Sequence, residues 1–423
     1  MSDATMAERL LTRSARRPVS AGDVVGVRAD AALGTDGSVP MALDCFAQIN
    51  GAEVTDEIDI VFALDHYAPP TSPAAVDVHR RMRSFASHHA VRLYEVGDGI
   101  GHQLMVEHGH VRPGTTCVAA DSHATTYGAL NAFGTGIGSS DLAVLMATGT
   151  LWFGVPESIQ VELCGSLGPD VAAKDLALHL VGRLGASGAR YAALEFTGRG
   201  VEKLDLDDRL VVANMAVEMG AKAGIFPCDD RLREELAEQD IPSDHGITPF
   251  DNARYMRSVH IDLSAIRPTI ATDDRVDATT TTDHLAGRPV TSCRIGTCTG
   301  GRTKDIRQAV EALDTAGGIA AGVNVVVTPA SRRVREQLDD EGITTRLHAM
   351  GAQIAMPGCG ACCGSAGDLP DDDDIVISTA NRNYRGRMGN PHATIMLASP
   401  ATVATAASRG AIVGTTDGER RHG

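Results

Sequence analysis

The feature that most constrains this fold is the C-terminal third of the chain, where short apolar runs alternate with helical patterns. Val323–Thr328, Gln353–Ala355 and Ile375–Ser378 are strand-like, and Thr303–Leu313 carries apolar residues on one helical face. Alternation of this kind is typical of a parallel sheet covered by helices. We therefore predict an α/β fold, in which ligands lie beyond the carboxyl ends of the strands.

The rest of the chain adds further elements to this pattern. Ser331 is a candidate N-cap for a helix over Arg332–Leu338, and Ile58–Ala63 is an expected strand. Leu210–Met219 is expected to be helical, and Ala271–Asp283, rich in Thr and Asp, is the candidate linker into the last domain. A chain of 423 residues exceeds a single hydrophobic core. We predict three α/β domains, over residues 1–165, 166–283 and 284–423.

Composition excludes several function classes. The net charge of −16 argues against a general nucleic-acid binder, because phosphate binding needs a basic surface. The apolar runs are too short and too interrupted to cross a bilayer, and the N-terminus lacks the apolar region of a signal peptide. Nine cysteines in a long chain do not resemble a disulfide framework. We expect a cytoplasmic protein with reduced thiols, in which Cys45, Cys117, Cys164 and Cys228 are small buried hydrophobes.

Three of the other cysteines lie on two glycine-rich loops. Cys359 and Cys362 are three residues apart in Gly-Cys-Gly-Ala-Cys-Cys-Gly, a spacing that also fits half of a zinc site or a redox pair. Cys298 precedes the helix over Thr303–Leu313, whose N-terminus favours a thiolate. Since no second Cys-x-x-Cys and no histidines at zinc-finger spacing accompany them, three protein ligands fit better than four. Such a centre keeps an open position for substrate, as catalytic metals do.

At this point the order of motifs resembles the aconitase superfamily. The strongest matches are Thr-Cys-Thr-Gly-Gly-Arg at 297–302, Gly-Cys-Gly-Ala-Cys at 358–362 and Asn-Arg-Asn-Tyr-Arg-Gly-Arg at 381–387. The chain looks most like the short archaeal-type large subunits of 3-isopropylmalate dehydratase and homoaconitase. The resemblance implies a three-domain aconitase-like large subunit with parallel-sheet α/β domains, lacking the swivel domain. It also implies one [4Fe-4S] cluster per subunit, held by Cys298, Cys359 and Cys362, whose fourth iron binds the substrate's hydroxyl and a carboxylate.

The resemblance also implies roles for the polar motifs. His66 beside Asp65 would protonate the leaving hydroxyl, and Arg382 and Arg387 would bind substrate carboxylates through their guanidinium forks. Without the motifs, each arginine could be a surface residue and each histidine a structural one. The remaining expected site residues are His102, Asp121 and His123 in the proton network, Ser122 at the substrate, and Asn214 and Glu218 on one helical face.

The implied reaction is the dehydration and rehydration of a small anionic hydroxy acid, with leucine biosynthesis as the expected pathway. The missing swivel domain predicts a separate small subunit that supplies the catalytic base, hence a heteromer without nucleic-acid or membrane partners. Alternatives are a homoaconitase, a methylmalate-type or specialised-metabolism dehydratase, and a cluster-less or RNA-binding paralogue. Two positions depart from the family pattern: Gly300 replaces a common Asn, and Cys363 follows Cys362 where an apolar residue is common.

Overall fold

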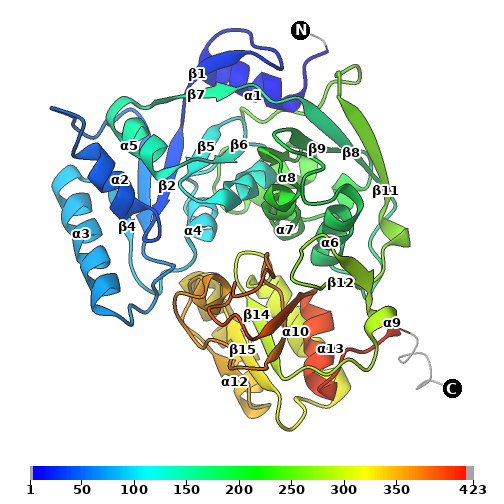
Figure 1. The fold of residues 1–423 in the computed structure, drawn as a ribbon. Helices are drawn as coiled ribbons and strands as arrows, with labels where there is room; N and C mark the ends of the chain where they lie inside the picture. Colours follow the sequence, from blue (N-terminus) through cyan, green and yellow to red (C-terminus); the bar gives the residue numbers. More distant parts are fainter. Residues whose placement is uncertain (1–2, 416–423) are drawn as a thin grey trace.

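The structure is a computed structural model that describes residues 3–415 of the chain (Figure 1). Its first layer is a parallel sheet of order β4-β3-β2-β5-β6, flanked by helices. The sheet strands are β2 (Ala31–Thr35), β3 (Asp59–Ala63), β4 (Arg92–Tyr94), β5 (Thr116–Ala119) and β6 (Phe133–Gly136). The helices of this region are α1 (Met6–Ala15), α2 (Val39–Phe46), α3 (Pro73–His89), α4 (Gly101–Glu107), α5 (Ser139–Thr148) and the 3-10 helix η1 (Ser122–Leu130). An antiparallel pair, β1 (Val24–Arg28) with β7 (Thr150–Gly154), lies beside it.

The second sheet is also parallel, with the order β10-β9-β8-β11. Its strands are β8 (Ser158–Cys164), β9 (Ala193–Thr197), β10 (Ala223–Ile225) and β11 (Arg257–Asp262). The helices between and after these strands are α6 (Ala173–Leu184), α7 (Leu206–Asn214) and α8 (Asp230–Ala237), with 3-10 turns η2 (Val201–Lys203), η3 (Met215–Met219) and η4 (Leu263–Ala265).

The third sheet has the order β13-β12-β18-β17-β14-β15-β16, and its five strands from β18 to β16 are parallel. The strands are β12 (Thr269–Ala271), β13 (Thr279–Thr281), β14 (Ser292–Gly296), β15 (Asn324–Thr328), β16 (Gln353–Ile354), β17 (Ile375–Ser378) and β18 (Thr394–Leu397). The helices are α9 (Thr282–Leu285), α10 (Thr303–Ala316), α11 (Arg332–Asp340), α12 (Ile343–Ala349), α13 (Pro400–Arg409) and the 3-10 turn η5 (Gly360–Cys363). The third sheet lies below the other two in Figure 1, with loops of all three meeting between them.

The predicted α/β class and parallel sheets are confirmed, and several elements match the expected bounds. Strand β17 covers Ile375–Ser378, and the Oγ of Ser331 accepts a hydrogen bond from Val334 N at the start of α11. The predicted linker over Ala271–Asp283 is wrong, because β13 lies within it and extends the third sheet through β12. Thr residues suit an exposed edge strand as well as a loop, so composition could not separate the two. The three-domain division stays a prediction.

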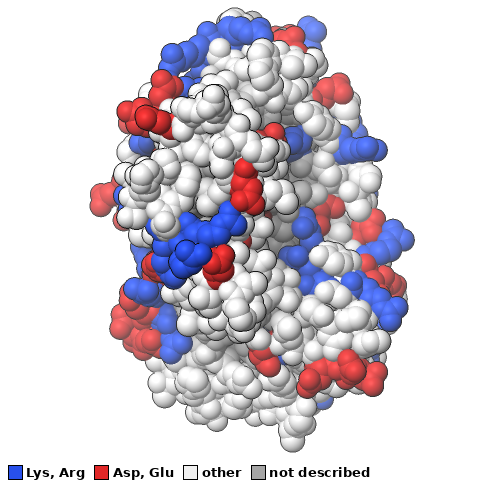
Figure 2. All heavy atoms as spheres, turned by 60° about the vertical axis from the view of Figure 1, so that its left-hand side comes forward, with Lys and Arg blue, Asp and Glu red and all other residues white. Residues whose placement is uncertain are grey.

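On the face drawn in Figure 2, basic side chains gather left of centre and along the top, and acidic side chains lie beside both groups. On α3, Arg80 pairs with Asp77 and Arg83 with Glu95. No helix within residues 3–415 combines the length and the apolar character needed to span a membrane. Cys164 is exposed, which corrects its prediction as a buried hydrophobe, because it is the last residue of β8 and lies at the sheet end.

Candidate active site

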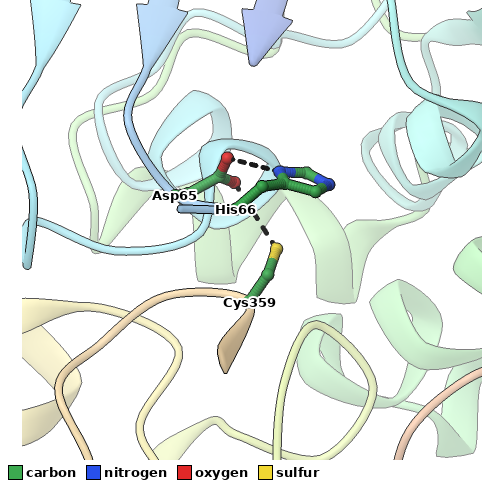
Figure 3. A group of neighbouring side chains, drawn as sticks. All are labelled: Asp65, His66 and Cys359. Carbon is green, nitrogen blue, oxygen red and sulfur yellow. Dashed lines mark hydrogen bonds and ion pairs between the residues drawn. The ribbon is translucent and has the colours of Figure 1, made fainter. Parts of the chain in front are cut away.

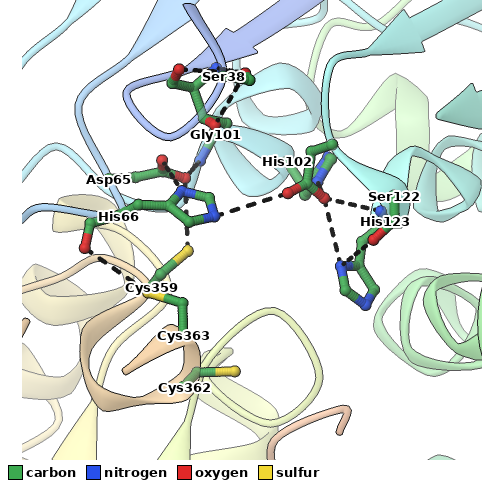
Figure 4. A network of polar contacts seen from close by, with 12 residues as sticks. Ser38, Asp65, His66, Gly101, His102, Ser122, His123, Cys359, Cys362 and Cys363 are labelled. Atoms are coloured by element: carbon green, nitrogen blue, oxygen red, sulfur yellow. Dashed lines mark hydrogen bonds and ion pairs between the residues drawn. The ribbon is translucent and has the colours of Figure 1, made fainter. Parts of the chain in front are cut away.

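The polar clusters around the first sheet follow the carboxyl ends of its strands, where ligands of parallel α/β sheets bind. Asp65 and His66 come after β3, and Asp121 comes after β5. The Nδ1 of His66 lies 2.7 Å from Asp65 Oδ1, and the other oxygen of Asp65 accepts the N–H of Gly101 at 2.7 Å. Asp65 therefore fixes both the imidazole and the start of α4 (Figure 4).

A second carboxylate, that of Asp36, also holds the loop that carries Asp65 and His66, although no sequence motif predicted a role for it. Asp36 accepts the backbone N–H groups of His66 and Tyr67, each at 2.9 Å, and lies 2.9 Å from His79 Nε2. Burial opposes the charge of Asp36, but the contacts with His79 and His66 still lower its pKa. Asp36 directly follows β2, so its position at the carboxyl end of a strand was the one sequence feature that could have predicted its place in the site.

Asp121 joins the three candidate histidines. Its Oδ1 lies 2.8 Å from His102 Nε2 and accepts the N–H of His123 at 2.8 Å, and its Oδ2 lies 3.7 Å from His66 Nε2. The other nitrogen of His102 is 3.0 Å from the hydroxyl of Tyr127. Burial alone would raise the pKa of Asp121, yet His102 and His123 hold it well below its ordinary value. A fixed negative charge therefore sits among these imidazoles.

Glu218 connects this network to the loop that follows β17 of the third sheet. Its Oε1 lies 3.1 Å from His123 Nε2 and accepts the Nε–H of Arg382 at 2.7 Å. Arg382 also donates to the Oγ of Ser122 at 3.0 Å, so two of its nitrogens are already engaged. Burial acts against ionised Glu218, but His123 and Arg382 lower its pKa overall. The predicted Ser122, Glu218 and Arg382 thus form one contact network between segments far apart in the sequence.

The shared helical face predicted for Asn214 and Glu218 is wrong, because α7 ends at Asn214 and the chain tightens into the 3-10 turn η3. Both side chains still reach the site. Asn214 donates from Nδ2 to Thr126 Oγ1 at 2.8 Å and hydrogen-bonds to the thiol of Cys298, while its buried Oδ1 has no partner in the part of the chain that the structure describes.

The three candidate cysteine ligands approach the same region from two loops. Asn381, a motif residue to which the sequence assigned no role, donates from Nδ2 to Cys298 Sγ at 3.3 Å, and its Oδ1 lies 3.7 Å from Cys362 Sγ. Cys359 Sγ lies 3.7 Å from Asp65 Oδ2, and its backbone N–H donates to Asp65 O at 2.9 Å. Figure 3 shows this thiol directed at the Asp65–His66 pair.

The turn geometry separates Cys362 from Cys363. Residues 360–363 form the 3-10 turn η5 with Cys359 as its N-cap. Cys362 Sγ lies 3.7 Å from Asn381 Oδ1, and Asn381 also contacts Cys298, so Cys362 and Cys298 meet at one side chain. The Sγ of Cys363 instead contacts the carbonyl oxygens of His66 at 3.8 Å and Gly360 at 3.6 Å. The geometry thus favours Cys362 as the ligand of the adjacent pair.

The donor set fits an iron–sulfur cluster. Burial, and after it the neighbouring Cys362, raise the pKa of Cys298 to about 12, so this thiol needs a nearby cation to become a thiolate. Iron with its sulfides is such a cation, and soft thiolates are its preferred ligands. The potential ligand atoms of Asp65, His66 and Cys359 all lie within 4.8 Å of one another. A carboxylate and an imidazole therefore lie beside one of the three candidate cysteine ligands.

Arg387 completes the side of the site next to the cysteines. Its NH2 donates to Cys362 Sγ at 3.9 Å and its NH1 to Tyr384 Oη at 3.5 Å, while its buried Nε has no partner among residues 3–415. Burial lowers the pKa of Arg387, but Cys362, Tyr384 and Cys363 together outweigh burial and raise this pKa. Unlike Arg382, Arg387 has a free, desolvated donor for an anionic ligand.

Comparisons with known proteins agree with these motifs. The model of the Aconitase family (aconitate hydratase) matches residues 71–287 and 274–410. The chain is 41% identical over 409 residues to the 3-isopropylmalate dehydratase large subunit 2 of Archaeoglobus fulgidus, covering 96% of this chain and 98% of that protein. It is 38% identical to the large subunit 1 of the Thermotoga maritima enzyme, with 96% and 98% covered.

Two further matches define the range of this similarity. A probable methanogen homoaconitase large subunit of Methanothermobacter thermautotrophicus is 36% identical, with 96% of each chain covered. The holo-form crystal structure of Thermococcus kodakaraensis aconitase X shares the fold with a TM-score of 0.52 at 12% identity, over 84% of each chain. The family match spans most of the sequence, and the resemblance first read from the motifs is confirmed: this chain belongs to the aconitase family.

Proposed function

We propose that this chain is the large subunit of a hydro-lyase of the 3-isopropylmalate dehydratase type, carrying one [4Fe-4S] cluster on Cys298, Cys359 and Cys362. The observation that carries the proposal is the contact of 3.7 Å between Cys359 Sγ and Asp65 Oδ2. It brings a cluster ligand next to the Asp65–His66 pair, although 294 residues separate the two in sequence. Acid–base groups and metal ligands thus meet at one centre, which is what metal-assisted dehydration requires.

The chemistry divides among the side chains at this centre. When bound, the cluster supplies a Lewis-acid iron for the hydroxyl and carboxylate of a hydroxy acid. His66 is held by Asp65 in position to give a proton to the departing hydroxyl. Burial lowers the pKa of His66, but the charges of Cys359 and Asp65 outweigh it and raise the pKa well above its ordinary value, which keeps the proton available at neutral pH.

The other polar groups orient the substrate and the proton network. Asp121 holds the ring of His102 through a contact of 2.8 Å and the backbone N–H of His123 through another of 2.8 Å, while the His123 ring is held by Glu218 Oε1 at 3.1 Å. Arg387 presents its Nε, which has no partner among the described residues, to a substrate carboxylate. Arg382 already donates to Glu218 and Ser122, so it would have to give up one of these hydrogen bonds to bind a carboxylate with its guanidinium fork. Stabilising the carbanion-like state next to a carboxylate is a role suited to such fixed positive charge.

The finer assignments rest on the relatives. Several of them are named as large subunits of 3-isopropylmalate dehydratase, which supports a heteromer with a small subunit and a place in leucine biosynthesis. We place the enzyme in the cytoplasm. Homoaconitase is the second candidate, because one relative with 96% coverage of each chain carries that name. Assaying the chain with its small subunit on isopropylmalate and homocitrate separates these two activities.

The cluster is tested by anaerobic reconstitution of the chain with iron and sulfide. Wild type should bind iron and acid-labile sulfide, and Cys298→Ser should lose most of both because one of three thiolate ligands is gone. Cys164→Ser is the matched control, since Cys164 is exposed at the end of β8. Equal iron and sulfide in wild type and Cys298→Ser would exclude the ligand assignment, and none in either would favour a cluster-less paralogue.

A further inference from the structure

Lys174 lies in the first turn of α6 and is 1% exposed. Its Nζ donates to the carbonyl oxygen of Ala380 at 2.7 Å, to that of Thr379 at 3.1 Å and to the hydroxyl of Thr299 at 3.2 Å. A fourth contact, at 3.7 Å, goes to the sulfur of Met215. A lysine side chain from the second sheet's helices is thus buried against two loops of the third domain.

These two loops carry the cluster machinery. Thr299 directly follows Cys298, and Ala380 directly precedes Asn381, whose amide contacts both Cys298 and Cys362. Thr299 also donates to the carbonyl of Thr379 at 2.7 Å, so the ammonium closes a small ring of hydrogen bonds between the loops. Displacing Lys174 would remove its bonds to the carbonyls of Thr379 and Ala380 and to the Thr299 hydroxyl, and would leave the Thr299–Thr379 bond as the remaining link of this ring.

Within residues 3–415 no carboxylate is hydrogen-bonded to the Nζ of Lys174, although the charges of Glu218 and Asp305 favour its protonated form. In the described part of the chain, all hydrogen bonds of its Nζ go to neutral groups. The adjacent Asp175 is occupied by the backbone N–H groups of Thr269 and Ala172. Burial lowers the pKa of Lys174 to about 8, opposed first by the charges of Cys298 and Cys362. A buried ammonium without a counter-ion is costly, and an anion is needed near it.

We propose that Lys174 is a positioning residue whose ammonium is the buried counter-charge of the iron–sulfur cluster and holds the Cys298 and Asn381 loops together. The inference rests on the proposed function, because the anion is the thiolate-bound cluster. A cation near a cluster favours its more reduced, more negative state, since net charge and hydrogen bonding set the reduction potential. Lys174 therefore raises the potential of the cluster and opposes its oxidation.

The test compares three variants after anaerobic reconstitution of the whole chain. Lys174→Gln keeps a donor for one carbonyl but loses the charge, and Lys174→Met loses both. Lys222→Met is the matched control, because Lys222 is partly buried with its ammonium 5.4 Å from the ring centroid of Tyr191. Two quantities are measured: the midpoint potential, by redox titration followed by electron paramagnetic resonance, and the rise in Tm between apo and reconstituted protein.

Both Lys174 variants should show a lower midpoint potential and a smaller rise in Tm on reconstitution than wild type and Lys222→Met. A merely structural lysine would lower the Tm of apo and reconstituted protein alike and leave the potential unchanged. An unchanged potential in Lys174→Gln overturns the proposal, and this variant carries the test if Lys174→Met does not fold. Wild type that takes up no iron and sulfide overturns the proposed function instead, so the two failures are distinct.

Discussion

Replacing Arg387 with Gln should reduce kcat/KM mainly by raising KM. The buried Nε of Arg387 has no partner in residues 3–415, and its NH2 lies 3.9 Å from Cys362 Sγ, so a substrate carboxylate beside the cluster would meet a desolvated donor. A hydrogen bond to a charged group contributes about 1.5–3 kcal/mol. Because each 1.4 kcal/mol is a factor of ten, the expected loss in kcat/KM is about 10- to 150-fold.

The assay uses the reconstituted chain with its small subunit and follows the ultraviolet absorbance of the enoic acid. Arg387→Lys should recover only part of the loss, because an ammonium cannot reproduce a planar fork. Arg385→Gln is the control, since Arg385 is exposed and, among the described residues, donates to the carbonyl of Pro391 alone. Iron content is measured in each variant to separate substrate binding from cluster loss. Equal kcat/KM in Arg387→Gln and Arg385→Gln would refute the reasoning.

Two further predictions concern stability. Gly300→Ala should lower Tm and cluster content together, because a Cβ there would lie 2.4 Å from Thr379 Cβ; a Tm equal to that of wild type would contradict this. Burial and the charge of Asp205 raise the pKa of Asp208 from 3.8 to about 7. The folded protein therefore favours protonated Asp208, and the free energy of unfolding falls as the pH rises from about 4 through 7. Asp208→Asn should therefore show a smaller fall in Tm than wild type between pH 5 and pH 8, and an identical fall would refute it.

The sequence predicted those parts of the fold that depend on local signals. Strand β17 and the Ser331 cap follow from an apolar run and a side chain that bonds three residues ahead. The cysteine loops were recognisable because glycines and thiols recur within a few residues. The 3-10 turn after Asn214 was not predictable in this way, because helix periodicity alone does not show where an α-helix tightens.

Contacts over long sequence separations were beyond prediction. Arg382 was expected to bind substrate, and its pairing with Glu218, 164 residues away, depends on how the loop after β17 packs against the turn η3. Asp36 and Lys174 carry no motif, and their importance appears only when His66 and the Thr379 carbonyl lie beside them. Burying a charged side chain at these positions costs free energy unless a partner from a distant part of the chain pairs with it. The sequence alone does not show where such partners lie.

The site therefore depends on packing between regions as much as on its motifs. The three proposed ligand cysteines lie on loops of the third sheet, but the backbone N–H of Cys359 donates to Asp65 O, which follows β3 of the first sheet. Lys174 of the second region bonds to the loop that follows Cys298. A small relative movement of these regions would leave the ligands in place and separate them from His66. Retention of the cluster without activity is thus the expected signature of a mutation that loosens these contacts.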